Sequence, residues 1–68
     1  MKLGEFINHI KHNSVEIKLI DFEIGTLFYS GSLGTYHHWI NKNETDNLLI
    51  ADIQFNNENV MCIYLEGE

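Results

Sequence analysis

The stretch that decides the fold is Leu3–Ile10, LGEFINHI, because it holds the helical pattern of this chain. Its apolar residues stand at positions 3, 6, 7 and 10, a spacing that places them on one face of a helix. We predict a helix over Lys2–His12, ended by Asn13-Ser14, because asparagine tolerates the left-handed conformation that often closes a helix. From Val15 onward the apolar residues alternate or run in short blocks, which indicates strands.

Four strand-like segments follow, and the first of them changes phase. Val15–Ile24 alternates between apolar and charged residues, but its phase reverses at Leu19-Ile20. The reversal predicts a β-bulge or bend there, or a strand that ends near Asp21. The later strand-like segments are Thr26–Ser30, Leu48–Phe55 and Val60–Leu65. The last is apolar on both faces, which is typical of a strand that is central in its sheet.

Short turns at Gly25 and Asn56–Asn59 join these segments into two antiparallel pairs. Between the pairs, Gly31–Gly34 predicts a loop and Thr35–Ile40 fits either a short strand or one helical turn. The polar segment Asn41–Asn47 predicts an exposed loop. The predicted fold is α+β in a single domain over residues 1–68. One N-terminal helix packs on a three- or four-stranded, mainly antiparallel sheet.

One helix covers only one face of such a sheet, yet two of the predicted strands carry apolar residues on both faces. We expect the aromatic segment Tyr36–Trp39 to fold over the second face, or else a second copy of the chain to cover it. A homodimer is therefore one of the partners that the sequence suggests.

Charge is unevenly distributed along the chain. The chain has no arginine and a net charge of −6, and residues 19–68 carry Lys42 alone against eight acidic residues. Because non-specific nucleic-acid binding depends on Lys and Arg, we expect no direct nucleic-acid contact. The acidic residues favour a partner protein with a basic surface, although they also fit a plain role in solubility.

Cys62 is the one cysteine, which excludes a disulfide within the chain and favours a reducing, cytoplasmic location. The opening residues become polar too early for a signal peptide, and no apolar run approaches the length of a membrane span. We therefore expect no membrane association.

Catalytic and cofactor motifs are not evident. Ser30 and Ser32 flank Gly31, but the run lacks the Gly-x-Ser-x-Gly elbow and any phosphate-binding lysine. We predict that the protein is not an enzyme and uses no cofactor. The four histidines are His9, His12, His37 and His38, and their spacing matches no zinc signature, so we predict no metal site. A metal-binding protein that uses these histidines is kept as an alternative.

Aromatic residues give the best binding candidates, because Tyr and Trp are enriched in interface hot spots. The candidate binding residues are Tyr29, Tyr36, His37, Trp39, Asp21, Glu23, Glu44 and Asp46. Two alternatives stay open: Trp39 and Ile40 close the core, or they point inward while Tyr36 and His37 point outward. The acidic residues act together only if the fold gathers them on one side.

The order of segments resembles that of small proteins from phages and mobile elements of low-GC Gram-positive bacteria. The resemblance is carried by Met1–Asn13 followed by Val15–Leu19, by Leu27–Gly31 and by Asn59–Glu66. Some acidic members of that group are anti-CRISPR proteins, which block the nucleic-acid groove of a CRISPR effector. The resemblance implies a non-enzymatic inhibitor of a host nucleic-acid-binding or defence protein, acting through an acidic and aromatic surface. The alternatives are a small homodimeric structural or assembly protein and the metal-binding protein.

Overall fold

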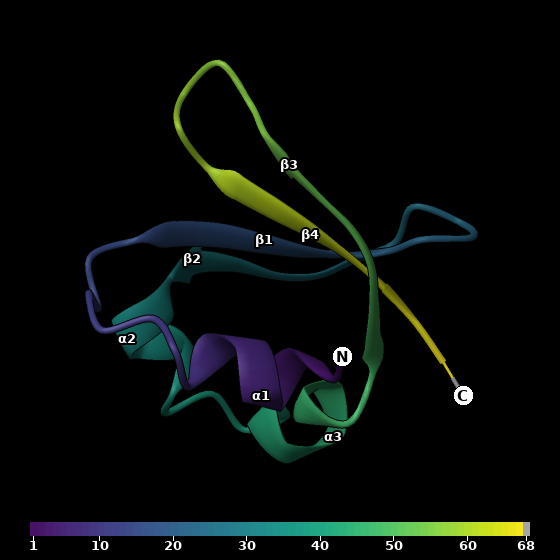
Figure 1. Ribbon diagram of the computed structural model, residues 1–68, viewed down its shortest axis with the longest axis horizontal. Helices are drawn as coiled ribbons and strands as arrows, with labels where there is room; N and C mark the ends of the chain where they lie inside the picture. Colours follow the sequence, from purple (N-terminus) through teal and green to yellow (C-terminus); the bar gives the residue numbers. More distant parts are fainter. Residues whose placement is uncertain (68) are drawn as a thin grey trace.

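The computed structural model describes residues 1–67, which form a four-stranded sheet with three short helices on one side of it (Figure 1). The helices are α1 (Leu3–Ile7), α2 (Leu33–Tyr36) and α3 (Lys42–Asp46). The strands are β1 (Glu16–Asp21), β2 (Leu27–Ser32), β3 (Leu49–Phe55) and β4 (Met61–Glu66). The predicted α+β class is confirmed.

The sheet has the strand order β2-β1-β4-β3 and is mixed. The pairs β1/β2 and β3/β4 are antiparallel hairpins, as predicted, and β4 is central. However, β1 and β4 are parallel, in a register that runs from Ile17 opposite Met61 to Asp21 opposite Leu65. The prediction of a mainly antiparallel sheet was therefore wrong. An apolar pattern shows which faces of a strand are buried, but it does not show which strand lies beside it.

The pairing of the first strand is irregular at Leu19-Ile20, where the sequence predicted a bulge or bend, but the extra residue lies in β2 and the β1/β4 register is regular there. The β1/β2 register shifts between Leu19 and Ile20, which leaves Phe28 as the extra residue opposite them. β1 ends at Asp21, whose carboxylate accepts hydrogen bonds from the backbone N–H groups of Glu23 and Ile24.

The first helix is shorter than predicted, because it ends at Ile7 instead of His12. The ring Nδ1 of His9 donates a hydrogen bond of 2.7 Å to the Glu5 carbonyl, which the His9 amide would use in a continuing α-helix. The amides of His9 and Ile10 instead bond to carbonyls three residues back, so the chain tightens and leaves the helix.

The predicted loops after β2 contain ordered elements. Gly31 and Ser32 belong to β2, and the Ser32 hydroxyl accepts a hydrogen bond from the Thr35 amide and so caps α2. The segment that fitted either a strand or a helical turn begins within α2. The polar segment predicted as an exposed loop contains α3, which buries Thr45.

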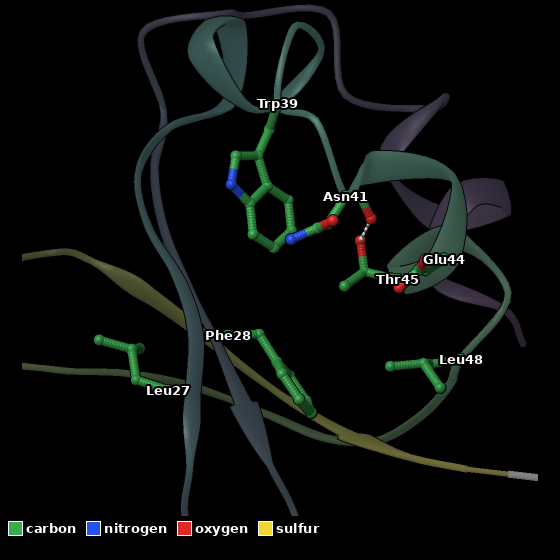
Figure 2. A pocket seen from close by; sticks show the side chains of 7 residues that line it. All are labelled: Leu27, Phe28, Trp39, Asn41, Glu44, Thr45 and Leu48. Atoms are coloured by element: carbon green, nitrogen blue, oxygen red, sulfur yellow. Dashed lines mark hydrogen bonds between the residues drawn. The ribbon is translucent and has the colours of Figure 1, made fainter.

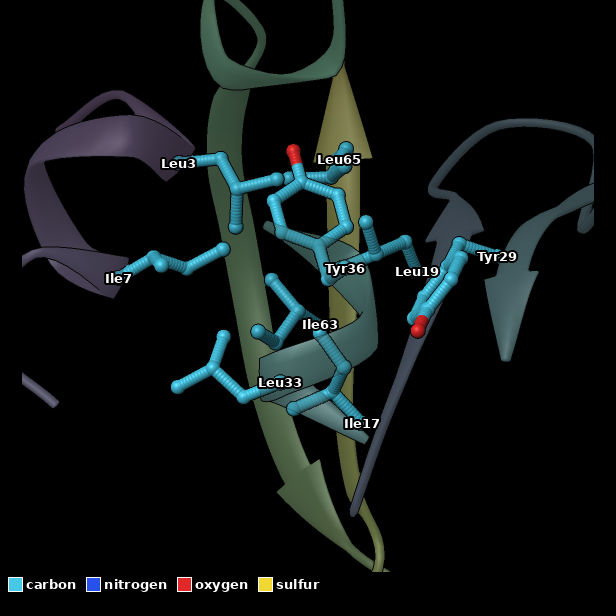
Figure 3. Close-up of a cluster of buried hydrophobic side chains, with 9 residues drawn as sticks. All are labelled: Leu3, Ile7, Ile17, Leu19, Tyr29, Leu33, Tyr36, Ile63 and Leu65. Atoms are coloured by element: carbon cyan, nitrogen blue, oxygen red, sulfur yellow. The ribbon is translucent and has the colours of Figure 1, made fainter. Parts of the chain in front are cut away.

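The core lies between the helices and one face of the sheet (Figure 3). Leu19 of β1 lies opposite Tyr29 of β2 and opposite Ile63 of β4, which forms one buried row across the strands. The cluster consists of Leu3, Ile7, Ile17, Leu19, Tyr29, Leu33, Tyr36, Ile63 and Leu65. Of the predicted helical stripe, Leu3 and Ile7 are buried, whereas Phe6 and Ile10 are half-buried.

No helix of residues 1–67 covers the second face of the sheet (Figure 1). Ile20 of β1 and Tyr64 of β4 lie opposite each other, one position along from Leu19 and Ile63 of the buried row, and so face away from the core. The expectation that Tyr36–Trp39 covers this face was wrong, because this segment packs with the helices on the first face. We call this outward side of the sheet, marked by Ile20 and Tyr64, the open face.

Candidate functional site

An open pocket of about 410 Å³ lies beside Trp39 and forms the best candidate site (Figure 2). Trp39 reaches into it from the turn after α2, and Asn41, Glu44, Thr45 and Leu48 border it on one side (Figure 2). We call it the Trp39 pocket, and its lining residues are Leu27, Phe28, Trp39, Asn41, Glu44, Thr45 and Leu48. Its volume falls within the range of small-ligand pockets, roughly 300–1,000 Å³.

Two aromatic rings, those of Tyr29 and Tyr36, hold Trp39 in place. The ring of Tyr29 lies 5.2 Å from that of Trp39 and 5.3 Å from that of Tyr36, in a T-shaped contact with the latter. The Tyr36 and Trp39 rings are 5.9 Å apart. Because Tyr29 and Tyr36 are buried while Trp39 is half-buried, Trp39 presents part of its indole to the pocket from a fixed support.

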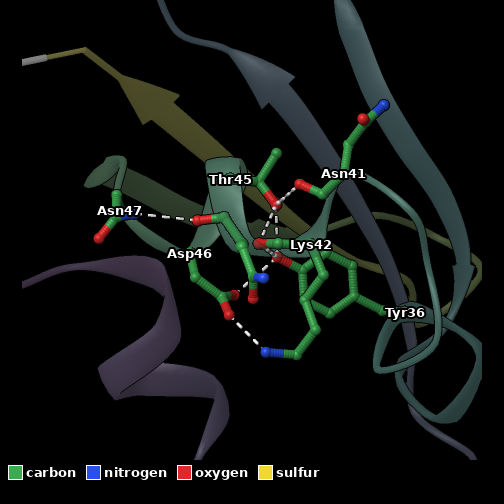
Figure 4. A network of polar contacts seen from close by, with 7 residues as sticks. Tyr36, Asn41, Lys42, Thr45, Asp46 and Asn47 are labelled. Carbon is green, nitrogen blue, oxygen red and sulfur yellow. Dashed lines mark hydrogen bonds and ion pairs between the residues drawn. The ribbon is translucent and has the colours of Figure 1, made fainter.

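A polar network fixes α3, which supplies the other wall of the pocket (Figure 4). The Tyr36 hydroxyl donates to Asp46 Oδ1 at 2.7 Å and also contacts the Thr45 hydroxyl. Asp46 Oδ2 forms an ion pair with Lys42. Thr45 and Asp46 are therefore held by this network, while Glu44 of the same helix lines the pocket.

The pKa of the Tyr36 hydroxyl lies above its ordinary value of 10.0. Burial is the largest cause, the hydrogen bond with Thr45 lowers the pKa, and the hydrogen bond to Asp46 and the charge of Asp46 raise it. Burial likewise raises the pKa of Tyr29. Both hydroxyls therefore keep their protons well into the alkaline range in the folded protein.

We expect the free energy of unfolding to fall as the pH rises above about 10, by about 1.4 kcal/mol per pH unit for Tyr36. Below that pH the contribution of Tyr36 is fully present, and above it the unfolded chain loses a proton that the fold retains. Urea unfolding of the wild type and of Tyr36→Phe between about pH 9 and about pH 11 measures it. The slope should be shallower in the variant, and parallel slopes would contradict the assignment.

The structure brings some of the candidate binding residues together and separates others. Glu44 and Trp39 line the same pocket, and Tyr29 supports it from behind. Asp21 and Glu23 lie at the turn between β1 and β2, and neither lines the pocket. The expected acidic surface is therefore not gathered around one site.

The sequence allowed an arrangement in which Ile40 points inward and Tyr36 points outward, and the structure shows the reverse for both residues. Tyr36 is fully buried and does not face outward, because its hydroxyl finds partners inside the fold. Ile40 is 91% exposed and does not close the core. His37 is half-buried, with its ring 6.3 Å from that of Tyr36 and outside the lining of the pocket.

Five lining residues were not among the candidates from the sequence: Leu27, Phe28, Asn41, Thr45 and Leu48. The sequence around Leu27 and Phe28 predicted a strand but gave no sign of a binding role. Thr45 lay within a polar segment that has no apolar pattern. The sequence carried no signal for Phe28, because the extra residue of the bulge lies in β2 whereas the reversal of the apolar pattern lies in the strand that pairs with it.

The histidines give the metal-binding alternative no site in the described part of the chain. Among residues 1–67, no group of three or more His, Cys, Asp or Glu side chains is placed to hold a metal ion. His9 uses its ring Nδ1 to bond the Glu5 carbonyl.

Comparison of the chain with protein-family models, with curated proteins and with solved structures gave no match. Within residues 1–67, no helix has the length and apolar character needed to cross a membrane.

Proposed function

We propose that the protein is a non-enzymatic interaction module that binds a basic partner protein through the Trp39 pocket and its acidic mouth. The observation that carries the proposal is an apolar pocket that opens beside an acidic side chain. Its walls combine Trp39 and Phe28, which are residue types suited to binding hot spots, with the carboxylate of Glu44.

The charges around the pocket support a basic partner. None of the lining residues is basic, and Lys42, the one cation after residue 18, is paired with Asp46. An approaching basic surface therefore meets Glu44 without competition from a cation of the pocket itself, and the net charge of −6 would steer it inward.

The resemblance to small phage proteins extends the proposal to a role in the host cytoplasm. There the module would inhibit a nucleic-acid-binding or defence protein by occupying its basic groove, as anti-CRISPR proteins do. The free and buried Cys62 suits a reducing compartment.

The test is capture of partners from a bacterial lysate on the immobilised protein, at salt concentrations from about 50 mM to about 500 mM. We expect a basic protein that is retained at low salt and lost at high salt. Leu27→Gln, which alters a half-exposed wall of the pocket, should reduce its capture. Ile40→Gln, which changes a residue outside the pocket, is the matched control. Absence of any salt-sensitive partner, or equal capture by both variants, would contradict the proposal.

A second candidate function is a homodimeric structural or assembly protein, and the open face favours it. Phe22 and Ile24 add exposed side chains, 52% and 77% accessible, at the turn that follows β1. Stacking two open faces would bury this apolar surface. Analytical sedimentation at micromolar concentration measures the oligomeric state. A strict monomer would exclude the homodimer function and leave the first proposal intact.

A further inference from the structure

We infer that the Trp39 pocket receives one arginine side chain of the partner. The guanidinium would lie against the Trp39 ring and beside the Glu44 carboxylate. This inference rests on the proposed function and names the group that the module recognises.

The walls of the pocket suit the stem of a long basic side chain. Leu27, Phe28 and Leu48 supply apolar surface, and the Thr45 hydroxyl is turned toward the Asn41 and Lys42 carbonyls. Arginine buries its three methylene groups on such surface while its charged head stays near water.

The mouth of the pocket suits the charged head. Within residues 1–67, the side chains of Glu44 and Asn41 form no hydrogen bond or ion pair, although both line the pocket and are exposed. Asn41 precedes α3 without capping it, and its side-chain amide lies beside the Trp39 ring (Figure 2). The pocket therefore offers one carboxylate, one side-chain amide and one aromatic face.

The combination favours arginine over other occupants. A planar guanidinium stacks on an aromatic ring and can donate two parallel hydrogen bonds to one carboxylate, whereas the lysine ammonium acts as a point charge. An apolar side chain would cover Glu44 and Asn41 and leave them unpaired. A second copy of this chain cannot supply the group, because the sequence contains no arginine.

Trp39 is the one tryptophan of the chain, so its fluorescence and its indole N–H resonance report on the pocket directly. The probes are blocked pentapeptides of glycine and alanine with a central arginine, citrulline, lysine or norleucine. Citrulline keeps the shape of arginine and removes its charge. We expect the arginine peptide to bind at least about tenfold more tightly than the citrulline peptide, and more tightly than the lysine and norleucine peptides.

Glu44→Gln should remove most of the preference for arginine over citrulline. Glu58→Gln, the same change in the exposed turn between β3 and β4, should keep it within about twofold of the wild type. Equal binding of the arginine and norleucine peptides would overturn the inference. So would equal binding of the lysine peptide, or no shift of the indole N–H resonance at about 20 mM peptide. In any of these cases the lysate experiment can still succeed, so failure of the inference is distinct from failure of the proposed function.

Discussion

Replacing Ile63 with alanine should lower the free energy of unfolding by about 2–5 kcal/mol. Ile63 is fully buried at the centre of β4, between Leu19 of β1 and Ile53 of β3, with Leu33 and Tyr36 over it (Figure 3). Strands on both sides hold the backbone in place, so the surroundings cannot collapse into the space that the side chain leaves.

The loss is large compared with the stability expected for a chain of 68 residues. At about 0.05–0.15 kcal/mol per residue the whole domain has about 3–10 kcal/mol, so the variant would leave much of the population unfolded at ambient temperature. Urea titration followed by circular dichroism measures the change. Ile40→Ala is the matched control, because Ile40 is 91% exposed and its loss should cost no more than about 0.5 kcal/mol. Equal midpoints for the two variants would show that Ile63 does not occupy the core.

The features of the fold that the sequence predicted correctly are those that depend on the residue pattern of a single segment. The change of apolar pattern after Leu19 precedes the end of β1 at Asp21, and the apolar run of β4 marks a central strand. Each follows from which side chains of one strand meet the core, and that information is local.

The parts that the sequence did not predict depend on contacts between distant segments. The parallel pairing of β1 with β4 joins residues more than forty positions apart, such as Ile17 and Met61. The apolar pattern of either segment does not specify which strand will pair with it. α3 was missed for a related reason. It has no apolar stripe, and its one buried residue is Thr45.

The candidate site shows the same division. Trp39 and Glu44 were found because their residue types suit binding, but the pocket between them requires Phe28 from the bulge and Leu48 from the start of β3. Tyr36 was expected at the surface because tyrosine carries a polar tip. It is buried because Asp46, ten positions later, provides the acceptor that makes burial of a hydroxyl acceptable.

Replacing Tyr36 with alanine should cost about 3–5 kcal/mol, because it removes a fully buried ring that contacts Tyr29 and Trp39. Tyr36→Phe separates the ring from the hydroxyl. It should cost only about 1 kcal/mol, because Asp46 keeps Lys42 and the Thr45 hydroxyl turns to the Asn41 or Lys42 carbonyl.

We expect the two variants to differ in the total loss of stability and also in which element loses protection from hydrogen exchange. Since α3 buries little else than Thr45, its attachment to the sheet depends on the network that Tyr36 completes (Figure 4). We therefore expect Tyr36→Phe to speed hydrogen exchange at the Thr45 amide, which bonds the Asn41 carbonyl, while amides of β4 stay protected. A uniform increase over both elements would mean that α3 is held by the core as a whole. Unchanged exchange at Thr45 would mean that the hydroxyl has no part in holding the pocket wall.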